Sequence, residues 1–446
     1  MAPDLPVELL RDIFAMSAPT REEAIELGRT SFLDVPWSLT LVCRQWRAIA
    51  LSMPSLWSSI TIVIAAWDPV GVWTKYPLGL LEAQIARSGT HALQVVLISE
   101  EDPGYTTQKI FSTIVSSCDR WETLELASAS HLQHLHRMRH NIPLLRQIYL
   151  SVPNQLGRLL AFAPQLQVAR IVSPGVKSRA DSHQAELNTR VPYPITLPWA
   201  QLRIFESSYD DPRQIDGMLL AQDLVECQVR IALRHAPWQP PAQPVVFQHL
   251  RKLTLAARAP HLDALLLPSL EALVLTLQGE FNHAVDMLQR SACSLRKLWV
   301  NECDPSVEQL LSIFSSNPNL FEIGLLGSNN NITAVVAALT LGPGKPVYAP
   351  DLTRFHAGDT RSNDTDQALN AILDMVESRL NLFHLHGCSR LEVLSLVRLE
   401  YRVYRPDFLA RIEAFQAAGL EVDFKNPEGK WSFRLGVSSG RLQRYI

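Results

Sequence analysis

The sequence has little of what disulfide-rich, zinc-binding and nucleic-acid-binding proteins need. Its six cysteines are scattered, with no Cys-x-x-Cys pair, so neither a disulfide framework nor a common zinc spacing is present. Lys and Arg number 41 against 44 Asp and Glu, and a net charge of −3 gives no drive toward nucleic acid or an anionic membrane. Charged residues interrupt the N-terminus, so we expect no secretory signal and an intracellular protein.

Motifs that support catalysis or cofactor binding are also missing. No Gly-x-Ser-x-Gly elbow occurs, and the stretch at residues 342–346, Gly-Pro-Gly-Lys-Pro, lacks the spacing of a phosphate-binding loop. Four histidines cluster without a carboxylate or cysteine beside them, at His131, His134, His136 and His140. A shared metal ion is one interpretation of that cluster, but a solvated helix face is favoured. We therefore expect no catalytic residue, metal or cofactor.

A long uncharged run raises the question of a membrane span. It extends from residue 48 to residue 67. Pro54 and several serines argue against a span. The run is better explained as the end of a helix, a turn, and a strand at residues 59–64 that is rich in β-branched residues.

Two apolar segments near the N-terminus predict a small helical module. The first begins at Leu5-Pro6, with proline suited to the first turn, and has an apolar stripe. The second carries its apolar residues on one helical face and arginines on the other, and a Leu-Trp pair follows it. Neither stripe buries itself, so the module needs a partner surface. Its candidate residues are Leu5, Pro6, Leu9, Leu10, Ile13, Phe14, Leu39, Val42, Cys43, Trp46, Leu56 and Trp57.

The order of these residues resembles an F-box. In that family the module docks on a Skp-type adaptor, which joins it to a cullin and the ubiquitin-transfer machinery, so the resemblance implies the same partners here. The link between Phe14 and Leu39 is about a dozen residues longer than in the compact motif, a length that a surface loop tolerates. This insertion resembles F-box-like proteins of filamentous fungi. The alternative is that these residues form only an internal helical cap.

Beyond residue 90 a short apolar pattern recurs about every 27 residues, as in a leucine-rich repeat. It predicts strands beginning at Leu93, Trp121, Leu145, Leu166, Leu202, Leu224, Leu250, Leu270, Leu295, Leu320, Leu352 and Leu391. Helices are expected between strands at 107–116, 154–162, 281–292 and 367–380, and from Asp304 as a cap with Pro305 in the first turn. A helix at 406–418 and a strand at 420–424 are expected to close the end.

The repeats depart from the regular pattern, because the asparagine or cysteine that normally follows each strand is present only as Cys303. Inserts are expected at 174–198, 236–244 and 342–350. The predicted fold class is therefore α/β, an N-terminal helical F-box module at residues 1–60 followed by an irregular leucine-rich-repeat-like α/β solenoid at 61–446. A non-repeat α/β domain is the alternative.

Alternate strand residues point away from the core and are the candidates for target binding. Among them are Tyr149, Lys252, Lys297, Trp299 and Glu322. Trp299 is the leading candidate because tryptophan often dominates interface energy. Burial against a neighbouring insert is the alternative for this side chain. The Pro-rich stretch at 237–244 could bind an aromatic groove as polyproline II, although an insert loop is favoured.

Three functions remain open from these residues. The first is a non-catalytic substrate receptor of a Skp-cullin-F-box (SCF) ubiquitin ligase, which raises the effective concentration of a target near the ubiquitin donor. The second is an F-box scaffold that acts outside ubiquitination. The third, an enzyme within the solenoid, has no residue constellation to support it. No nucleic-acid or membrane partner is expected.

Overall fold

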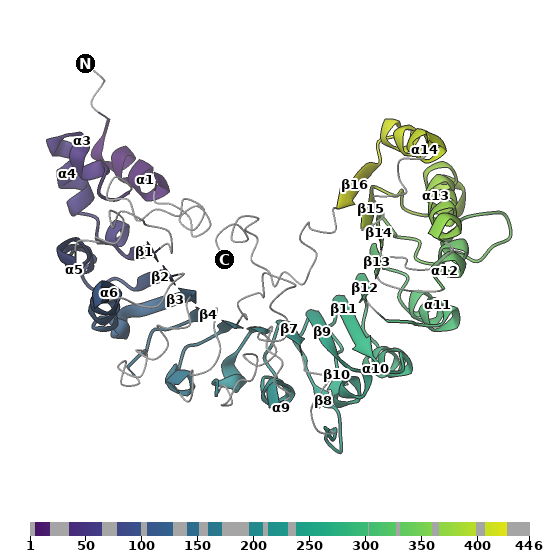
Figure 1. Cartoon of the computed structure of the whole chain (residues 1–446), viewed down its shortest axis with the longest axis horizontal. Coiled ribbons are helices and arrows are strands. Elements are labelled where there is room, and N and C mark those ends of the chain that lie inside the picture. The colour runs from purple at the N-terminus through teal and green to yellow at the C-terminus, as the bar shows by residue number, and fades with distance from the viewer. Residues whose placement is uncertain are drawn as a thin grey trace. The chain divides into compact units, whose positions relative to one another are not determined.

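The structure is a computed structural model of the chain (Figure 1). It describes residues 5–17, 35–64, 78–99, 105–127, 141–150, 159–171, 196–207, 213–230, 238–301, 303–326, 331–358, 365–397 and 406–425. Two compact units are distinguished, one of Met1–Asp211 with Leu435–Ile446 and one of Pro212–Arg434.

The first unit begins with helices and continues as alternating strands and helical turns. Its elements are α1 (Val7–Ser17), α3 (Leu39–Val42), α4 (Arg44–Leu51), η1 (Pro54–Trp57), β1 (Ser59–Ile64), α5 (Leu78–Arg87), β2 (Leu93–Ser99), α6 (Tyr105–Val115), η2 (Cys118–Arg120), β3 (Trp121–Ala127), β4 (Gln147–Leu150), η4 (Leu159–Phe162), β5 (Val168–Ile171), η5 (Trp199–Gln201) and β6 (Ile204–Ser207). Strands β1 to β6 pair in chain order, and every pair is parallel.

The second unit repeats the strand and helix alternation with longer helices. Its elements are α9 (Arg213–Leu220), β7 (Glu226–Arg230), β8 (Val245–Val246), β9 (Lys252–Arg258), η6 (Ala259–Ala264), β10 (Leu265–Leu266), β11 (Ala272–Gln278), α10 (Asn282–Ser291), β12 (Lys297–Asn301), α11 (Val307–Ser316), β13 (Glu322–Leu326), α12 (Ile332–Leu339), β14 (Arg354–Gly358), α13 (Thr365–Asn381), η7 (Phe383–His386), β15 (Val393–Val397), α14 (Pro406–Ala417) and β16 (Glu421–Lys425).

Within this unit β7, β9 and β11 to β16 form one parallel sheet, and β8 pairs with β10 beside it. Helices α10 to α14 lie along one side of the strands (Figure 1). The core lies between strands and helices, because alternate strand residues such as Leu298 and Val300 are buried there.

The twelve strands predicted from the repeat pattern are all present: two begin at the predicted apolar residue, and the other ten begin two residues after it. Each of those starting residues is itself buried. The predicted class is confirmed: an N-terminal helical module is followed by an irregular, leucine-rich-repeat-like α/β solenoid of parallel strands. The division at residue 60 stays a prediction. In the described residues just before β5 and β6, the elements are the short 3₁₀ turns η4 and η5.

Buried polar side chains satisfy backbone groups between neighbouring repeats. The Leu277 N–H donates to the Cys303 sulfur at 3.0 Å, so this cysteine takes the place expected of it in the repeat. Three polar side chains near the ends of helices likewise accept hydrogen bonds from backbone N–H groups of the preceding repeat. Ser291 accepts from the Leu267 N–H, Asn317 from the Leu295 N–H and Ser378 from the Leu341 N–H.

The insert at 342–350 is held by one buried side chain. Arg379 of α13 is fully buried, and its guanidinium donates to the carbonyls of Leu339, Tyr348 and Ala349 at 2.7–3.1 Å. Burial lowers the pKa of Arg379 to about 10, but three carbonyl acceptors keep the charged form hydrogen-bonded. The insert is thus an ordered part of the repeat.

Two predicted helices differ from the structure. Helix α11 begins at Val307 with Ser306 as its cap rather than Asp304, because Ser306 and Gln309 form a reciprocal capping box. The helix predicted at 154–162 lies partly outside the described residues, and its described end is the 3₁₀ turn η4. Most of the insert predicted at 174–198 also lies outside them, as do the histidines at 131–140.

Candidate functional site

The helical module has a compact core of its own. Leu10 and Phe14 of α1 pack with Leu39, Ile49 and Trp57, and the whole cluster also includes Ala50, Leu56, Val35, Trp37, Trp46 and Met53. The Phe14 and Trp46 rings meet edge to face with centroids 5.0 Å apart. The module therefore folds on residues that its own sequence supplies.

The second predicted helix is in fact two. Cys43 adopts an extended conformation between α3 and α4, and its sulfur accepts a hydrogen bond from the Trp46 N–H. Because the chain turns at this residue, Leu39 is buried while Val42 and Cys43 are exposed. The expectation that the apolar residues of this segment share one helical face is wrong, since a single helix would have to continue through residue 43.

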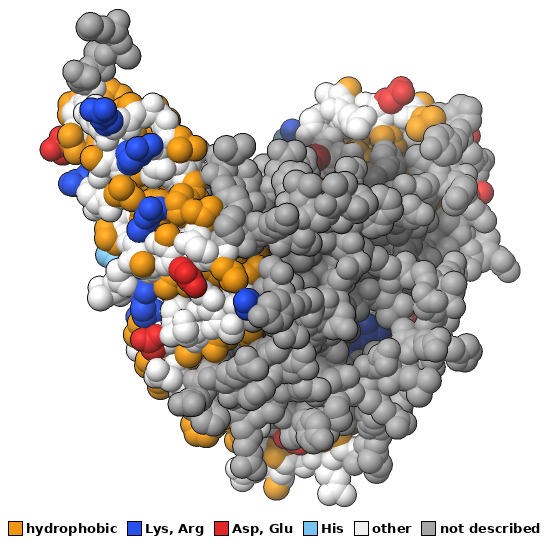
Figure 2. Space-filling model, turned by 60° about the vertical axis from the view of Figure 1, so that its left-hand side comes forward, with side chains coloured by type: hydrophobic (Ala, Val, Ile, Leu, Met, Phe, Trp, Pro, Cys, Tyr) orange, Lys and Arg blue, Asp and Glu red, His pale blue; other side chains and the backbone are white. Residues whose placement is uncertain are grey.

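One side of α1 presents apolar side chains to solvent. Leu9 is 50% exposed and Ile13 is 41% exposed, and Met16, one turn further along the same side, is 77% exposed. Leu5 before the helix extends the stripe. We call Leu5, Leu9, Ile13 and Met16 the α1 stripe. Figure 2 shows hydrophobic side chains gathered over the end of the molecule that Figure 1 assigns to α1, α3 and α4.

The candidate adaptor residues thus divide into two groups. Leu10, Phe14, Leu39, Leu56 and Trp57 are buried and Trp46 is half buried, so these hold the module together. Those at the surface are Leu5, Pro6, Leu9, Ile13, Val42 and Cys43.

Sequence reasoning missed four other exposed apolar residues of the module, Val7, Met16, Leu41 and Leu51. Helical periodicity gives a signal for Met16, which lies three residues after Ile13 and seven after Leu9. Leu41 has no such signal, because its exposure depends on the turn at Cys43. Exposed apolar residues that lie together on a surface mark an interaction site.

The module is joined directly to the first repeat. Ser58 alone separates η1 from β1, and the Gln94 N–H of β2 donates to its carbonyl. The Gln84 amide of α5 donates to the Ser59 carbonyl at 2.8 Å. Arg87, at the end of α5, places its guanidinium over both the Trp37 and Trp57 rings, at 4.7 and 4.6 Å from their centroids.

A polar and aromatic cluster covers part of the outward strand face in the second unit. Glu322 is its centre: it accepts from the Trp299 indole at 2.8 Å and pairs with Lys297 at 2.7 Å. His356 lies 3.5 Å from the same carboxylate and stacks on the Trp299 ring at 4.5 Å. We call Lys297, Trp299, Glu322 and His356 the Glu322 cluster.

Trp299 lies flat on the sheet because its neighbour has no side chain. Trp299 and Gly324 are register partners in β12 and β13, and a Cβ on Gly324 would lie 2.5 Å from the indole ring. The tryptophan points away from the core, as the strand alternation predicts, yet only 3% of it is exposed. Lys297 is the more accessible member, with a third of its side chain exposed.

The other candidate target residues lie in separate ion pairs on outward faces. Lys252 of β9 pairs with Glu226 of β7 at 2.6 Å in the second unit. In the first unit the Arg170 guanidinium lies over the Tyr149 ring at 5.2 Å and pairs with Glu206 at 3.1 Å. The five candidates therefore do not form one continuous site, since only Lys297, Trp299 and Glu322 contact one another.

The remaining motifs fit structural roles. Trp238, in the Pro-rich stretch, donates to Asp216 at 3.1 Å and stacks on buried His261. Burial lowers the pKa of His261 and raises the pKa of the Cys118 and Cys293 thiols, so these groups stay neutral at pH 7. Across the described ranges, no group of side chains is arranged to hold a metal ion. Of the helices in those ranges, none has the length and apolarity needed to cross a membrane.

An F-box-like family model matches residues 2–63. No curated protein matches the sequence. Among solved structures, an internalin from Listeria monocytogenes is similar to the chain with 13% identity and a TM-score of 0.32, over 81% of this chain and 95% of the internalin.

Proposed function

We propose that this protein is a non-catalytic substrate-recognition subunit of an SCF-type ubiquitin ligase. Its F-box module would bind a Skp-type adaptor, and through it a cullin, while the solenoid binds a protein target. The observation that supports this most is the α1 stripe, exposed on the segment that matches the F-box-like model. Such a receptor needs no catalytic residue, because it acts by holding the target close to the ubiquitin donor. Its place would be inside the cell.

The stripe is suited to docking because its members are not needed for the module's own core. Leu10 and Phe14 face inward on α1, whereas Leu9 and Ile13 face solvent on the adjacent side. Full burial of a leucine-sized side chain contributes roughly 1.5–3 kcal/mol, and because Leu9 and Ile13 are about half exposed, docking would contribute roughly half of that at each. A charge placed at either position would have to be desolvated on docking, at a cost of several kcal/mol.

The experiment that tests the adaptor claim is co-purification with a Skp-type adaptor. We expect the native chain to retain the adaptor and the double variant Leu9→Asp, Ile13→Asp to lose it. The matched control is Ala15→Asp, which adds the same charge to an exposed position on another side of α1. Thermal unfolding must show that all variants stay folded. If the double variant retains the adaptor, or the native chain fails to bind it, the ubiquitin-ligase proposal is withdrawn.

We further propose that the Glu322 cluster contributes to target binding. Its members combine an aromatic ring with charges held by short bonds, which is the chemistry of interface hot spots. Trp299→Ala is expected to weaken capture of the target and to leave the adaptor complex intact. Proteins stabilised by proteasome inhibition and proximity-labelled by the native chain supply the targets for this assay. Unchanged capture by the variant would remove Trp299 from the site.

The same experiment separates the receptor from a scaffold. A receptor predicts that at least one labelled protein accumulates when this chain is lost and becomes ubiquitinated when the chain is restored. If the adaptor binds but no labelled protein changes in abundance, a scaffold outside ubiquitination is the better description. The Leu9→Asp, Ile13→Asp variant provides the control, because it retains the solenoid and lacks the docking stripe.

A further inference from the structure

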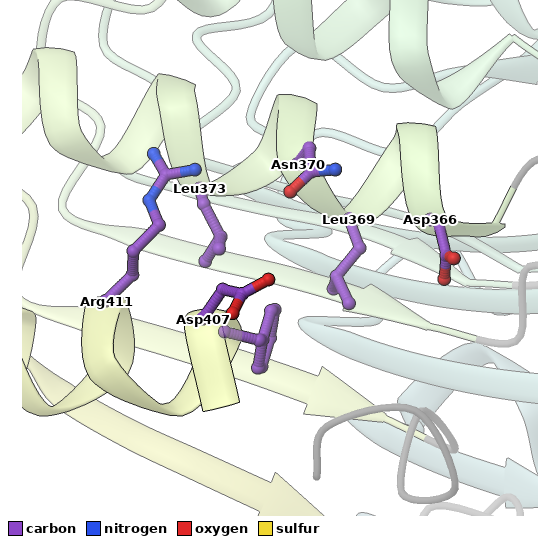
Figure 3. A pocket seen from close by; sticks show the side chains of 7 residues that line it. Asp366, Leu369, Asn370, Leu373, Asp407 and Arg411 are labelled. Atoms are coloured by element: carbon purple, nitrogen blue, oxygen red, sulfur yellow. The ribbon is translucent and has the colours of Figure 1, made fainter. Parts of the chain in front are cut away.

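The hollow of about 110 Å³ between helices α13 and α14 offers no open apolar surface (Figure 3). Its floor residues, Leu369, Leu373 and Phe408, are at most 6% exposed. An apolar segment that is open to solvent lies elsewhere in the second unit, in the Pro-rich stretch before β8. The six residues at 239–244, Gln-Pro-Pro-Ala-Gln-Pro, are all exposed, and three of them are prolines.

This stretch is held at both ends. At its start the Trp238 indole donates to the Asp216 carboxylate at 3.1 Å and lies on the ring of buried His261, with the centroids 4.7 Å apart. At its end the chain enters β8, which pairs with β10. Between these anchors, no hydrogen bond joins residues 239–244 to another described residue. The stretch is therefore fixed in place while its prolines stay in contact with solvent.

Proline restricts the backbone of this stretch to extended conformations. Pro240, Pro241 and Pro244 have φ fixed at about −65°, and each proline also disfavours the helical region for the residue before it. Ala242 is the one residue of the six under neither restriction. The chain bends at Ala242 and Gln243, but no residue of the stretch has a positive φ. Pro240 and Pro241 thus suit polyproline II, and a rotation at Ala242 would extend it to Pro244.

A second exposed stretch has the same Pro-x-x-Pro spacing but a different backbone. Pro343 and Pro346 lie in the insert at 342–350, and both are exposed. Gly344 between them has a φ of +74°, which lies outside polyproline II. Of these two stretches, only the one at 239–244 has a backbone that can present prolines in this conformation.

We propose that residues 239–244, the proline arm, bind a partner protein that has an aromatic-lined groove for polyproline II. Aromatic side chains in such a groove pack on proline rings, and their polar ends donate to the exposed carbonyls of the ligand. Polyproline II repeats every three residues, so Pro241 and Pro244 would lie on one edge of the bound arm. Anchors at both ends reduce the conformational entropy that is lost on binding. The arm shares no residue with the F-box module or the Glu322 cluster, so this partner is additional to the adaptor and the target.

The test uses the full chain and a panel of purified SH3 and WW domains, two classes whose aromatic grooves bind polyproline II. Isothermal titration calorimetry measures their affinities, and a synthetic Pro-rich peptide shows that each domain is active. We expect at least one domain to bind the native chain. The double variant Pro241→Ala, Pro244→Ala should bind it about tenfold more weakly, because ring contacts and the restriction of the free backbone are both lost. The matched control is Pro343→Ala, Pro346→Ala, which makes the same change at the same spacing and should leave binding unchanged.

Two further measurements have an expected result. Ala242→Pro should tighten binding about two- to fivefold, because it restricts the one unrestricted residue of the arm before binding. The Ala242 N–H has no hydrogen-bond partner among the described residues, so this substitution removes none. Binding should change less than about twofold between about 0.05 and 0.5 M salt, because the arm has no charged residue for salt to screen.

Each other result overturns the proposal. If no domain of the panel binds the native chain, or if the two double variants weaken binding equally, the arm is not a ligand for an aromatic groove. Weaker binding by Ala242→Pro would show that polyproline II is not the bound conformation. A steep fall of affinity with salt would place the contact on charged residues outside the arm. Thermal unfolding of every variant excludes misfolding as the cause.

Discussion

Arg87 and Trp57 join the helical module to the repeats through a guanidinium stacked on an indole, 4.6 Å from the ring centroid. Trp57 is fully buried, and its indole N–H donates to the Ala50 carbonyl at 2.8 Å. Trp37 lies on the guanidinium as well, and the Trp37 and Trp57 rings meet edge to face. The Nη1 atom of Arg87 is buried with no hydrogen-bond partner among the described residues, so the aromatic faces are its main compensation.

Replacement of Arg87 should therefore loosen the junction. We expect Arg87→Ala to lower the free energy of unfolding by about 1–2 kcal/mol, the range for partly desolvated cation–π contacts. Arg87→Lys keeps the charge and loses the planar group, so its free energy of unfolding should lie between those of Arg87→Ala and the native chain. Urea unfolding followed by tryptophan fluorescence measures the effect. Equal stability of Arg87→Ala and the native chain would show that the stacking contributes nothing.

Gly324 should tolerate no side chain. Gly324→Ala places a methyl group inside contact distance of the Trp299 ring, so the ring must leave the sheet and give up its bond to Glu322. We expect a loss of about 1–3 kcal/mol, as for other overpacked sites.

Gly79→Ala is the matched control for this substitution. Gly79 lies in α5 with open space where a Cβ would be, so alanine there should stabilise the chain by about 0.5–1 kcal/mol. Differential scanning calorimetry of both variants should show a lowered thermal midpoint for Gly324→Ala and a raised one for Gly79→Ala. A stabilised Gly324→Ala would contradict the packing described for Trp299.

Cys303 should matter more than an ordinary buried cysteine. Cys303→Ala leaves the Leu277 N–H buried without this acceptor, at a cost of about 1–3 kcal/mol. Cys293→Ala, which removes a buried thiol from the preceding repeat, should cost less because no backbone group depends on it in the same way. Chemical denaturation of the two variants tests this order. Cys303→Asn, which restores an acceptor, should recover part of the loss.

His261 should make stability fall with acidification. Its pKa is lowered chiefly by burial. The imidazole packs on the Trp238 ring, and the charged groups near it are Arg258 and Asp216. The unfolded chain therefore binds more protons as pH falls below the ordinary value of 6.5, and stability present above that pH is lost below it.

The variant His261→Phe keeps a ring on Trp238 and does not titrate. We expect its thermal midpoint to fall less between pH 7 and pH 5 than that of the native chain, even though it loses the hydrogen bond to the Arg258 carbonyl. Melting curves across this pH range measure the difference. Parallel curves for the two proteins would show that the histidine has the same pKa folded and unfolded.

The strands could be predicted from sequence because their signal is local. A buried leucine such as Leu295, followed by Leu298 and Val300, determines the start and the inward face of β12 without reference to any other repeat. Residues that act between repeats could not be predicted this way. Asn317 accepts from Leu295 and Arg379 holds the insert only after distant segments are brought together.

The candidate sites show the same limit. The apolar stripe of α1 follows from helical spacing, but which part of it faces solvent depends on the packing of α4 against Leu10 and Phe14. The burial of Trp299 depends on Gly324, which lies 25 positions further along and is its register partner in the next strand.

The single residue between Trp57 and Ser59 has a consequence for how the chain tolerates insertions. A flexible tether would accept one more residue with little effect, but here the next element is a strand paired with β2 from its first residue. Side chains alternate between the two faces of a strand, so an insertion at Ser58 would exchange the inward positions of Ile60 and Ile62 for outward ones unless the pairing slipped to compensate. The length of this junction is therefore fixed as strictly as any core side chain, and changes in length between the two modules would have to occur elsewhere.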